Sequence, residues 1–197
     1  MSRPKAFDPD VALDRATDLF RRKGYAATSV GDLVEHTGLS RSSLYDTFGD
    51  KHALFLAALD RYRVRGSDFL SEVLENAESP MSGLRAYFDA LAADCACPDE
   101  GRYGCLAVNA AAECAATDAD TAERSAQNWN GMTQAFAALV RRAQEQGEIT
   151  PDRDADALGH FLTNAVYGLR GLQTAGAPAS AVRSVIDTTL DVLATPR

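Results

Sequence analysis

Glycine residues divide this sequence into segments that each carry a helical pattern of apolar residues. In the first segment, Ala12, Ala16 and Phe20 recur every four residues and Gly24 follows, which predicts a helix that ends at this glycine. Similar segments, with apolar residues three and four apart, continue almost to the C-terminus. A sustained alternation of apolar and polar residues, which is typical of strands, does not occur. The sequence therefore predicts an all-α fold of about nine helices.

Two short helices separated by a tight turn are predicted between residues 28 and 51. Thr28 or Ser29 can cap the first helix, which ends at Gly38, and Ser40 can cap the second, which ends at Gly49. Such a pair is a helix-turn-helix, whose second helix fits the major groove of double-stranded DNA. Apolar residues would hold the pair together: Val30, Leu33, Val34, Leu39, Leu44 and Phe48. The outer face of the second helix is donor-rich and suited to base edges and phosphates, with Arg41, Ser42, Ser43, Tyr45 and Thr47.

Charge is distributed unevenly along the chain. The net charge of −8 by itself disfavours binding to phosphate, but residues 1–65 carry +2 and residues 66–197 carry −10. We expect a DNA-binding domain at residues 1–50 and a ligand-binding and dimerisation domain at residues 51–197.

No apolar run approaches the roughly 18 residues of a membrane span, and the N-terminus has no apolar signal segment. These observations predict a cytoplasmic protein with no membrane partner.

Residues 8–56 resemble the TetR family of transcriptional regulators closely. The matching residues are Gly24-Tyr25, Thr28-Ser29-Val30, Leu33-Val34, Thr37-Gly38-Leu39-Ser40, Ser43-Leu44-Tyr45, Phe48, Lys51 and Leu54-Phe55. The resemblance implies that Thr28, Tyr45 and Lys51 contact phosphates. It also implies base or backbone contacts by a second set, Arg41, Ser42, Ser43 and Thr47.

The layout of the family implies a homodimer. Helices at about 152–175 and 178–193 would form a four-helix bundle with their copies in a second subunit. Glycines within the first of these helices support a close helix approach, because glycine in a helix interior costs about 1 kcal/mol. The same glycines could instead pack within one chain. The predicted interface residues are Gly159, Ala165, Gly168, Gly171 and Val185.

The remaining helices would line a pocket for a small-molecule effector. Aromatic side chains with a few amides form a typical lining. The candidates are Phe69, Tyr87, Phe88, Leu91, Cys105, Asn109, Trp129, Phe136, Phe161, Asn164 and Tyr167. Each of them could equally be an ordinary core residue of a helical domain.

Cys105 belongs to a segment, Arg102-Tyr103-Gly104-Cys105-Leu106 with Asn109 and Glu113, that is similar to the NemR-like branch of the family. In that branch the matching cysteine is reactive. A position in the first turn of a helix, with Arg102 nearby, would favour the thiolate. We therefore predict a redox-sensing role for Cys105; the alternative is a packed core cysteine.

Cys95 and Cys97, joined by Cys105, Cys114 or His160, are candidate ligands for a metal ion. The one-residue spacing of the first two cysteines does not fit the two-to-four spacing of structural zinc sites. We expect no metal and no cofactor.

Catalysis has little support in the sequence. Phosphate-cradling glycine loops, HExxH and Gly-x-Ser-x-Gly motifs do not occur, and Glu113 and Glu123 are interpreted as solvated or helix-capping charges.

The sequence predicts a homodimeric repressor that leaves a palindromic operator when a small molecule binds or a thiol is modified. The alternatives are a helical enzyme and a constitutive DNA-binding protein without an effector.

Overall fold

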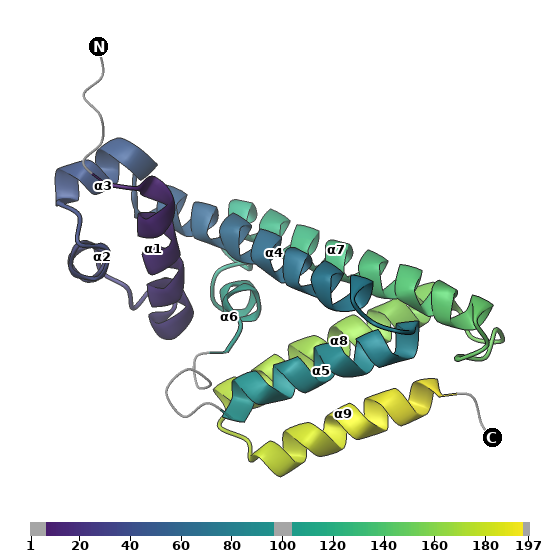
Figure 1. The fold of residues 1–197 in the computed structure, drawn as a ribbon. Coiled ribbons are helices and arrows are strands. Elements are labelled where there is room, and N and C mark those ends of the chain that lie inside the picture. The colour runs from purple at the N-terminus through teal and green to yellow at the C-terminus, as the bar shows by residue number, and fades with distance from the viewer. Residues whose placement is uncertain (1–6, 97–103, 195–197) are drawn as a thin grey trace. The chain divides into compact units, whose positions relative to one another are not determined.

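The computed structural model describes residues 7–96 and 104–194 of the chain. Within these residues the chain forms nine α-helices and one isolated β-bridge, between Ile149 and Ala194 (Figure 1). The helices are α1 (Pro9–Lys23), α2 (Val30–Thr37), α3 (Arg41–Phe48), α4 (Lys51–Glu75), α5 (Pro80–Ala96), α6 (Leu106–Glu113), α7 (Ala119–Glu145), α8 (Ala155–Thr174) and α9 (Ala179–Leu193). The predicted all-α fold is confirmed.

The described chain forms two compact units. The first unit extends to Arg65 and also contains Cys105–Ser125, and the second contains the described residues of 66–104 and those from Ala126 onward. The first unit is therefore larger than the domain predicted at residues 1–50, because α6 and the start of α7 belong to it. A functional boundary at residue 50 stays a prediction.

Local sequence signals define α1, α2 and α3. Gly24 ends α1 with a φ of +77°, a conformation that glycine adopts without steric cost. Ser29 and Asp32 form a capping box at the start of α2, in which each side chain binds the backbone N–H of the other residue. Ser40 caps α3 by accepting the N–H of Ser43 at 3.1 Å. The predicted stops at glycines and starts at serines are confirmed.

The core of the first unit joins these three helices to α4 and α6. Phe20 of α1 and Phe55 of α4 meet edge to face, with ring centroids 5.1 Å apart. Leu33 of α2 and Leu44 of α3 are fully buried in the same cluster, and Leu106 of α6 completes it. Full burial of one such leucine contributes about 1.5–3 kcal/mol. The helix-turn-helix thus has a shared core with α6.

The second unit is built around a larger apolar cluster from the C-terminal part of α4 and from α5, α7, α8 and α9. Fully buried members include Leu84, Phe88, Phe136, Leu162 and Ile186. Among the residues described, no helix combines the length and the apolar character needed to cross a membrane.

At Gly159, α8 packs closely against α7. A Cβ atom at this position would lie 2.8 Å from the carbonyl oxygen of Thr133 and 3.0 Å from the Cβ atom of Ala137. Gly159 is buried, and its carbonyl accepts the Thr163 hydroxyl at 2.9 Å. The small residue at position 159 is therefore required for packing within the chain, which is the alternative that the sequence left open, and a role of Gly159 at a subunit interface stays a prediction.

Candidate nucleic-acid interface

One face of α3 is polar and open to solvent. Arg41, Ser42 and Tyr45 are exposed, with 36% of the Tyr45 surface accessible, whereas Leu44 on the opposite face is completely buried. Ser43 is half-buried. The hydroxyl of Ser40 lies 3.0 Å from that of Ser42 and donates to that of Ser43 at 2.9 Å, which orders the first turn. The predicted outer face of α3 therefore presents one cation, a phenol and a hydroxyl cluster.

Two predicted DNA contacts are oriented differently from the rest. Thr28 is completely buried, and its hydroxyl donates to the carbonyl oxygen of Gly24 at 2.6 Å. Thr47 Oγ1 is also buried and has no hydrogen-bond partner in the part of the chain described. Neither hydroxyl faces solvent, so each would have to reorient before it could contact DNA.

Lys51 begins α4, shortly after the end of α3. Its ammonium lies 4.3 Å from the centroid of the Tyr25 ring, a cation–π contact. Tyr25 itself packs on Phe55, with ring centroids 4.6 Å apart. The lysine is therefore held by a side chain that is anchored in the core of the first unit.

Lys23 and Asp32 stabilise the start of α2 on the outside. The Lys23 ammonium lies 2.9 Å from the Asp32 carboxylate. This ammonium, followed by the backbone and hydroxyl donors of Ser29, holds the pKa of Asp32 well below its usual range. The capping box is thus ionised at any physiological pH.

Glu113, the last residue of α6, binds the turn between α1 and α2. Its carboxylate accepts the backbone N–H of Tyr25 at 2.9 Å and that of Ala26 at 2.7 Å. The sequence analysis predicts a solvated or helix-capping charge for Glu113. No local pattern identifies Glu113 as the acceptor for Ala26, which lies 87 residues before it in the sequence. This contact is the main feature of the unit that sequence reasoning missed.

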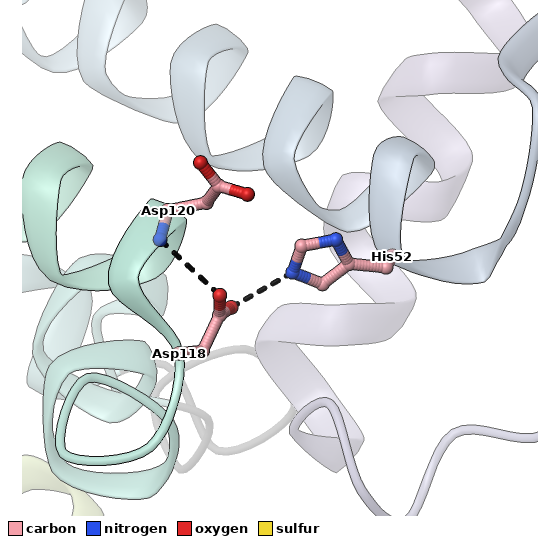
Figure 2. Close-up of side chains that lie close together, drawn as sticks. All are labelled: His52, Asp118 and Asp120. Atoms are coloured by element: carbon pink, nitrogen blue, oxygen red, sulfur yellow. Dashed lines mark hydrogen bonds and ion pairs between the residues drawn. The ribbon is translucent and has the colours of Figure 1, made fainter.

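His52, Asp118 and Asp120 form a second cluster in the first unit, between the starts of α4 and α7 (Figure 2). The Asp118 carboxylate lies 2.8 Å from His52 Nε2 and accepts the N–H of Asp120 at 3.2 Å and the hydroxyl of Thr121. These donors, first the hydroxyl and then the imidazole, lower the pKa of Asp118 to about 2. Asp118 is thus an N-terminal cap of α7 that also binds α4.

The same three residues offer ligand atoms within 4.8 Å of one another, a spacing compatible with a metal ion. The site lies at the N-terminal ends of two helices, however, where the backbone dipoles favour negative charge and oppose a cation. Capping and the His52 contact account for the Asp118 carboxylate completely.

Cys105 lies immediately before α6, as its N-cap residue, rather than inside the first turn as predicted. It is a free thiol, half-buried, and its side chain makes no capping hydrogen bond. Cys114 at the other end of α6 is buried, and this burial raises the pKa of its thiol, with the charges of Glu113 and Asp118 adding to the rise. Cys97 and Arg102, and the side chain of Cys95, lie outside the described part of the structure.

The predicted pocket residues differ in burial and in the helices that carry them. Tyr87, Phe88, Leu91 and Phe136 are buried in the core of the second unit, while Phe161 and Asn164 are exposed on α8. Trp129 stacks on His160, and Tyr167 meets the Trp129 ring edge to face, with ring centroids 5.1 Å apart. Asn109 lies half-buried on α6.

A groove of about 490 Å³ lies between α4 and α5 in the second unit. It is lined by Phe69, Glu72, Val73, Asn76, Ala77, Ser82 and Ala86. Among the predicted lining residues, Phe69 contributes to it, and its ring also packs on Tyr87 with centroids 5.9 Å apart.

The outer surfaces of α8 and α9 carry apolar and small residues. Val185 and Val192 on α9 are 38% and 41% exposed, and Phe161 on α8 is 39% exposed. A Cβ atom at Gly168 or Gly171 would meet no atom within 4 Å. These positions leave room for another helix, unlike Gly159.

Comparison with known proteins identifies the class. Residues 12–58 match the family model of bacterial regulatory proteins of the tetR family, and residues 80–187 match the tetracyclin repressor-like C-terminal domain. The chain belongs to the TetR family of DNA-binding transcriptional regulators.

Two bacterial relatives are similar along nearly the whole chain. The transcriptional repressor ComR of Escherichia coli is 33% identical over 95% of this chain and 90% of its own length. The uncharacterized regulator YezE of Bacillus subtilis is 31% identical over 98% of this chain and 100% of its own.

Solved structures agree with the fold. A cysteine mutant of the TetR family regulator CifR, complexed with 26-bp double-strand operator DNA, has a TM-score of 0.85 and 28% identity, over 98% of this chain and 100% of that one. Reduced NemR of E. coli has the same TM-score, 0.85, at 17% identity over 95% and 97% of the two chains, which shows a shared fold.

Proposed function

We propose that the chain is a homodimeric repressor that reads a palindromic operator with α3. The observation that carries this proposal is the exposed polar face of α3, mounted on the buried Leu44 and capped by Ser40. Arg41, Ser42 and Ser43 contact base edges or backbone, and Tyr45 and Lys51 bind phosphates. A single helix of this size fits the major groove of B-DNA.

The homodimer is supported by the apolar and small residues on α8 and α9. Phe161, Val185 and the open positions Gly168 and Gly171 offer a surface on which two helices of a second copy pack. A two-fold protein matches a two-fold operator, with two copies of α3 one helical turn apart.

Release from the operator would follow either the binding of a small molecule or the modification of a thiol. The groove between α4 and α5 offers apolar wall, one carboxylate from Glu72 and the amide of Asn76. Cys105 offers a partly accessible thiol, which is a requirement for modification. Either event acts only if it favours a conformation with lower operator affinity.

The test begins with selection of a duplex from a random pool by the purified protein. The selected duplex is then used in gel shifts with and without a panel of small molecules and thiol reagents. Release by one member supports an effector-controlled repressor. Tight specific binding that no compound changes favours a constitutive DNA-binding protein.

A further inference from the structure

We propose that Glu113 is a positioning residue for DNA binding. Its carboxylate fixes the turn between α1 and α2 and thereby the placement of the helix-turn-helix. The inference rests on the proposed recognition of an operator by α3 and assigns a role to a residue outside the DNA-binding motif.

The contact joins a charge to two adjacent backbone donors. Glu113 accepts from Tyr25 N and Ala26 N at 2.9 and 2.7 Å. Hydrogen bonds of N–H groups to an ionised carboxylate are about twice as strong as those between neutral groups. Two such bonds to consecutive residues fix both the orientation of the peptide plane between these residues and its distance from the carboxylate.

The turn has room for this carboxylate only because residue 24 is glycine. A Cβ atom at Gly24 would lie 2.8 Å from Glu113 Oε2, and the φ of +77° already favours glycine. Thr28 closes the turn from inside, through its hydroxyl bond to the Gly24 carbonyl at 2.6 Å and its N–H bond to the Tyr25 carbonyl at 3.3 Å. The buried Thr28 hydroxyl and Glu113 therefore hold opposite sides of one loop.

This loop leads directly into α2, which begins after the Ser29 cap. A loosened loop would let α2, and α3 packed on it, sample more orientations in the free protein. Ordering them again on DNA would reduce affinity, because binding must then supply the lost freedom.

Glu113→Gln should change the affinity for DNA in opposite directions, depending on whether Glu113 is only a surface charge or a positioning residue. Removing a carboxylate from a DNA-binding unit reduces repulsion of phosphate and should tighten binding. Losing the two charged hydrogen bonds should instead weaken it, and we expect a loss of roughly tenfold. The matched control is Asp120→Asn, which removes one exposed carboxylate from the same unit without touching the turn.

The measurement is fluorescence anisotropy with a duplex selected by the wild-type protein, repeated over a series of salt concentrations. Glu113→Gln should bind more weakly with an unchanged salt slope, while Asp120→Asn binds as well as wild type or better. Amide exchange at Tyr25 and Ala26 should accelerate in Glu113→Gln alone. Binding by Glu113→Gln as tight as wild type would overturn the inference. A wild-type protein that selects no duplex would instead contradict operator recognition, and this inference with it.

A double-mutant cycle gives a second, independent test. Gly24→Ala introduces a Cβ atom that must displace the carboxylate, so part of its effect disappears once Glu113 is already glutamine. The two substitutions should therefore be non-additive in their effect on Kd. Additive effects would mean that the glycine and the glutamate act separately.

Discussion

Arg41 and Lys51 are two cations of the first unit for which we propose different roles in DNA recognition. Arg41 is exposed in the first turn of α3, where a planar guanidinium can read a base edge. Lys51 starts α4 and lies over the Tyr25 ring, outside α3, the helix that we propose enters the groove. We therefore assign specificity to the arginine and general affinity to the lysine.

Arg41→Ala should weaken binding to the selected duplex by about 1–3 kcal/mol and relax the preference at one base pair if Arg41 reads guanine. The measurement is a competition assay with duplexes changed at single positions. An unchanged base preference together with unchanged affinity would contradict the placement of Arg41 on the reading face.

Lys51→Ala should weaken binding to all duplexes alike and reduce the slope of log Kd against log salt by about 1. Arg142→Ala, which removes an exposed cation from α7 in the second unit, serves as the control and should leave the slope unchanged. Equal slopes for Lys51→Ala and wild type would remove Lys51 from the phosphate contacts.

Asp118 makes the stability of the first unit dependent on pH in the acid range. Since folding lowers its pKa from 3.8 to about 2, its stabilising effect is complete above 3.8 and is lost as the pH falls to about 2. Asp118→Asn should therefore reduce the free energy of unfolding at neutral pH, and the difference from wild type should shrink as the pH falls through this range. Urea denaturation at a series of pH values measures both. A difference that is constant with pH would show that the Asp118 charge contributes nothing.

At the scale of elements, sequence signals predicted the helices well where the signal is local. Ser29, Ser40, Gly24 and Gly38 fix the ends of α1, α2 and α3 through bonds within a few residues, and such patterns can be recognised in one chain. The Glu113 contact could not be predicted in this way, because Tyr25 and Ala26 lie 88 and 87 residues before Glu113 in the sequence. The inward orientation of Thr28 follows from the same fold-dependent turn.

The predicted pocket residues are divided between the core and the surface of the structure, and their place in a ligand pocket stays a prediction. Aromatic residues such as Phe88 and Phe136 fill the core, whereas the groove between α4 and α5 is lined largely by small and polar residues that carry no distinctive pattern. Composition can identify candidates for a lining, but only packing decides which of them border a cavity.

Helix α6 is flanked by two cysteines in contrasting environments, which gives a test of thiol sensing. Cys105 precedes its first turn and is half-buried, whereas Cys114 is buried with a raised pKa. At neutral pH, N-ethylmaleimide should label Cys105 faster than Cys114, because the thiolate is the reactive form. Peptide mass spectrometry follows the labelling.

If Cys105 is the sensor, alkylation should release wild-type protein from DNA but not Cys105→Ser, which must still bind. Slower labelling of Cys105 than of Cys114 would reduce Cys105 to a packing residue. A small molecule would then be the remaining candidate trigger.

At the scale of the whole molecule, the proposed function requires one chain to provide both a DNA-binding unit and, on α8 and α9, a surface for a second copy. Light scattering at micromolar concentration should therefore give about twice the chain mass of 21.1 kDa. Gly168→Glu adds a charge at an open position of α8 and should dissociate the dimer and abolish operator binding together. Gly131→Glu, at an open and exposed position of α7, is the matched control. A monomeric wild type that still binds a palindrome tightly would count against the α8–α9 interface.

The most direct test of operator recognition by α3 in a dimer is hydroxyl-radical footprinting on the duplex selected by the wild-type protein. Two protected half-sites related by two-fold symmetry are expected, with centres one helical turn or a multiple of it apart. Arg41→Ala should change protection at the same position in both halves. A single protected half-site, or protection no stronger than on random DNA, would contradict a dimeric regulator that reads its operator with α3.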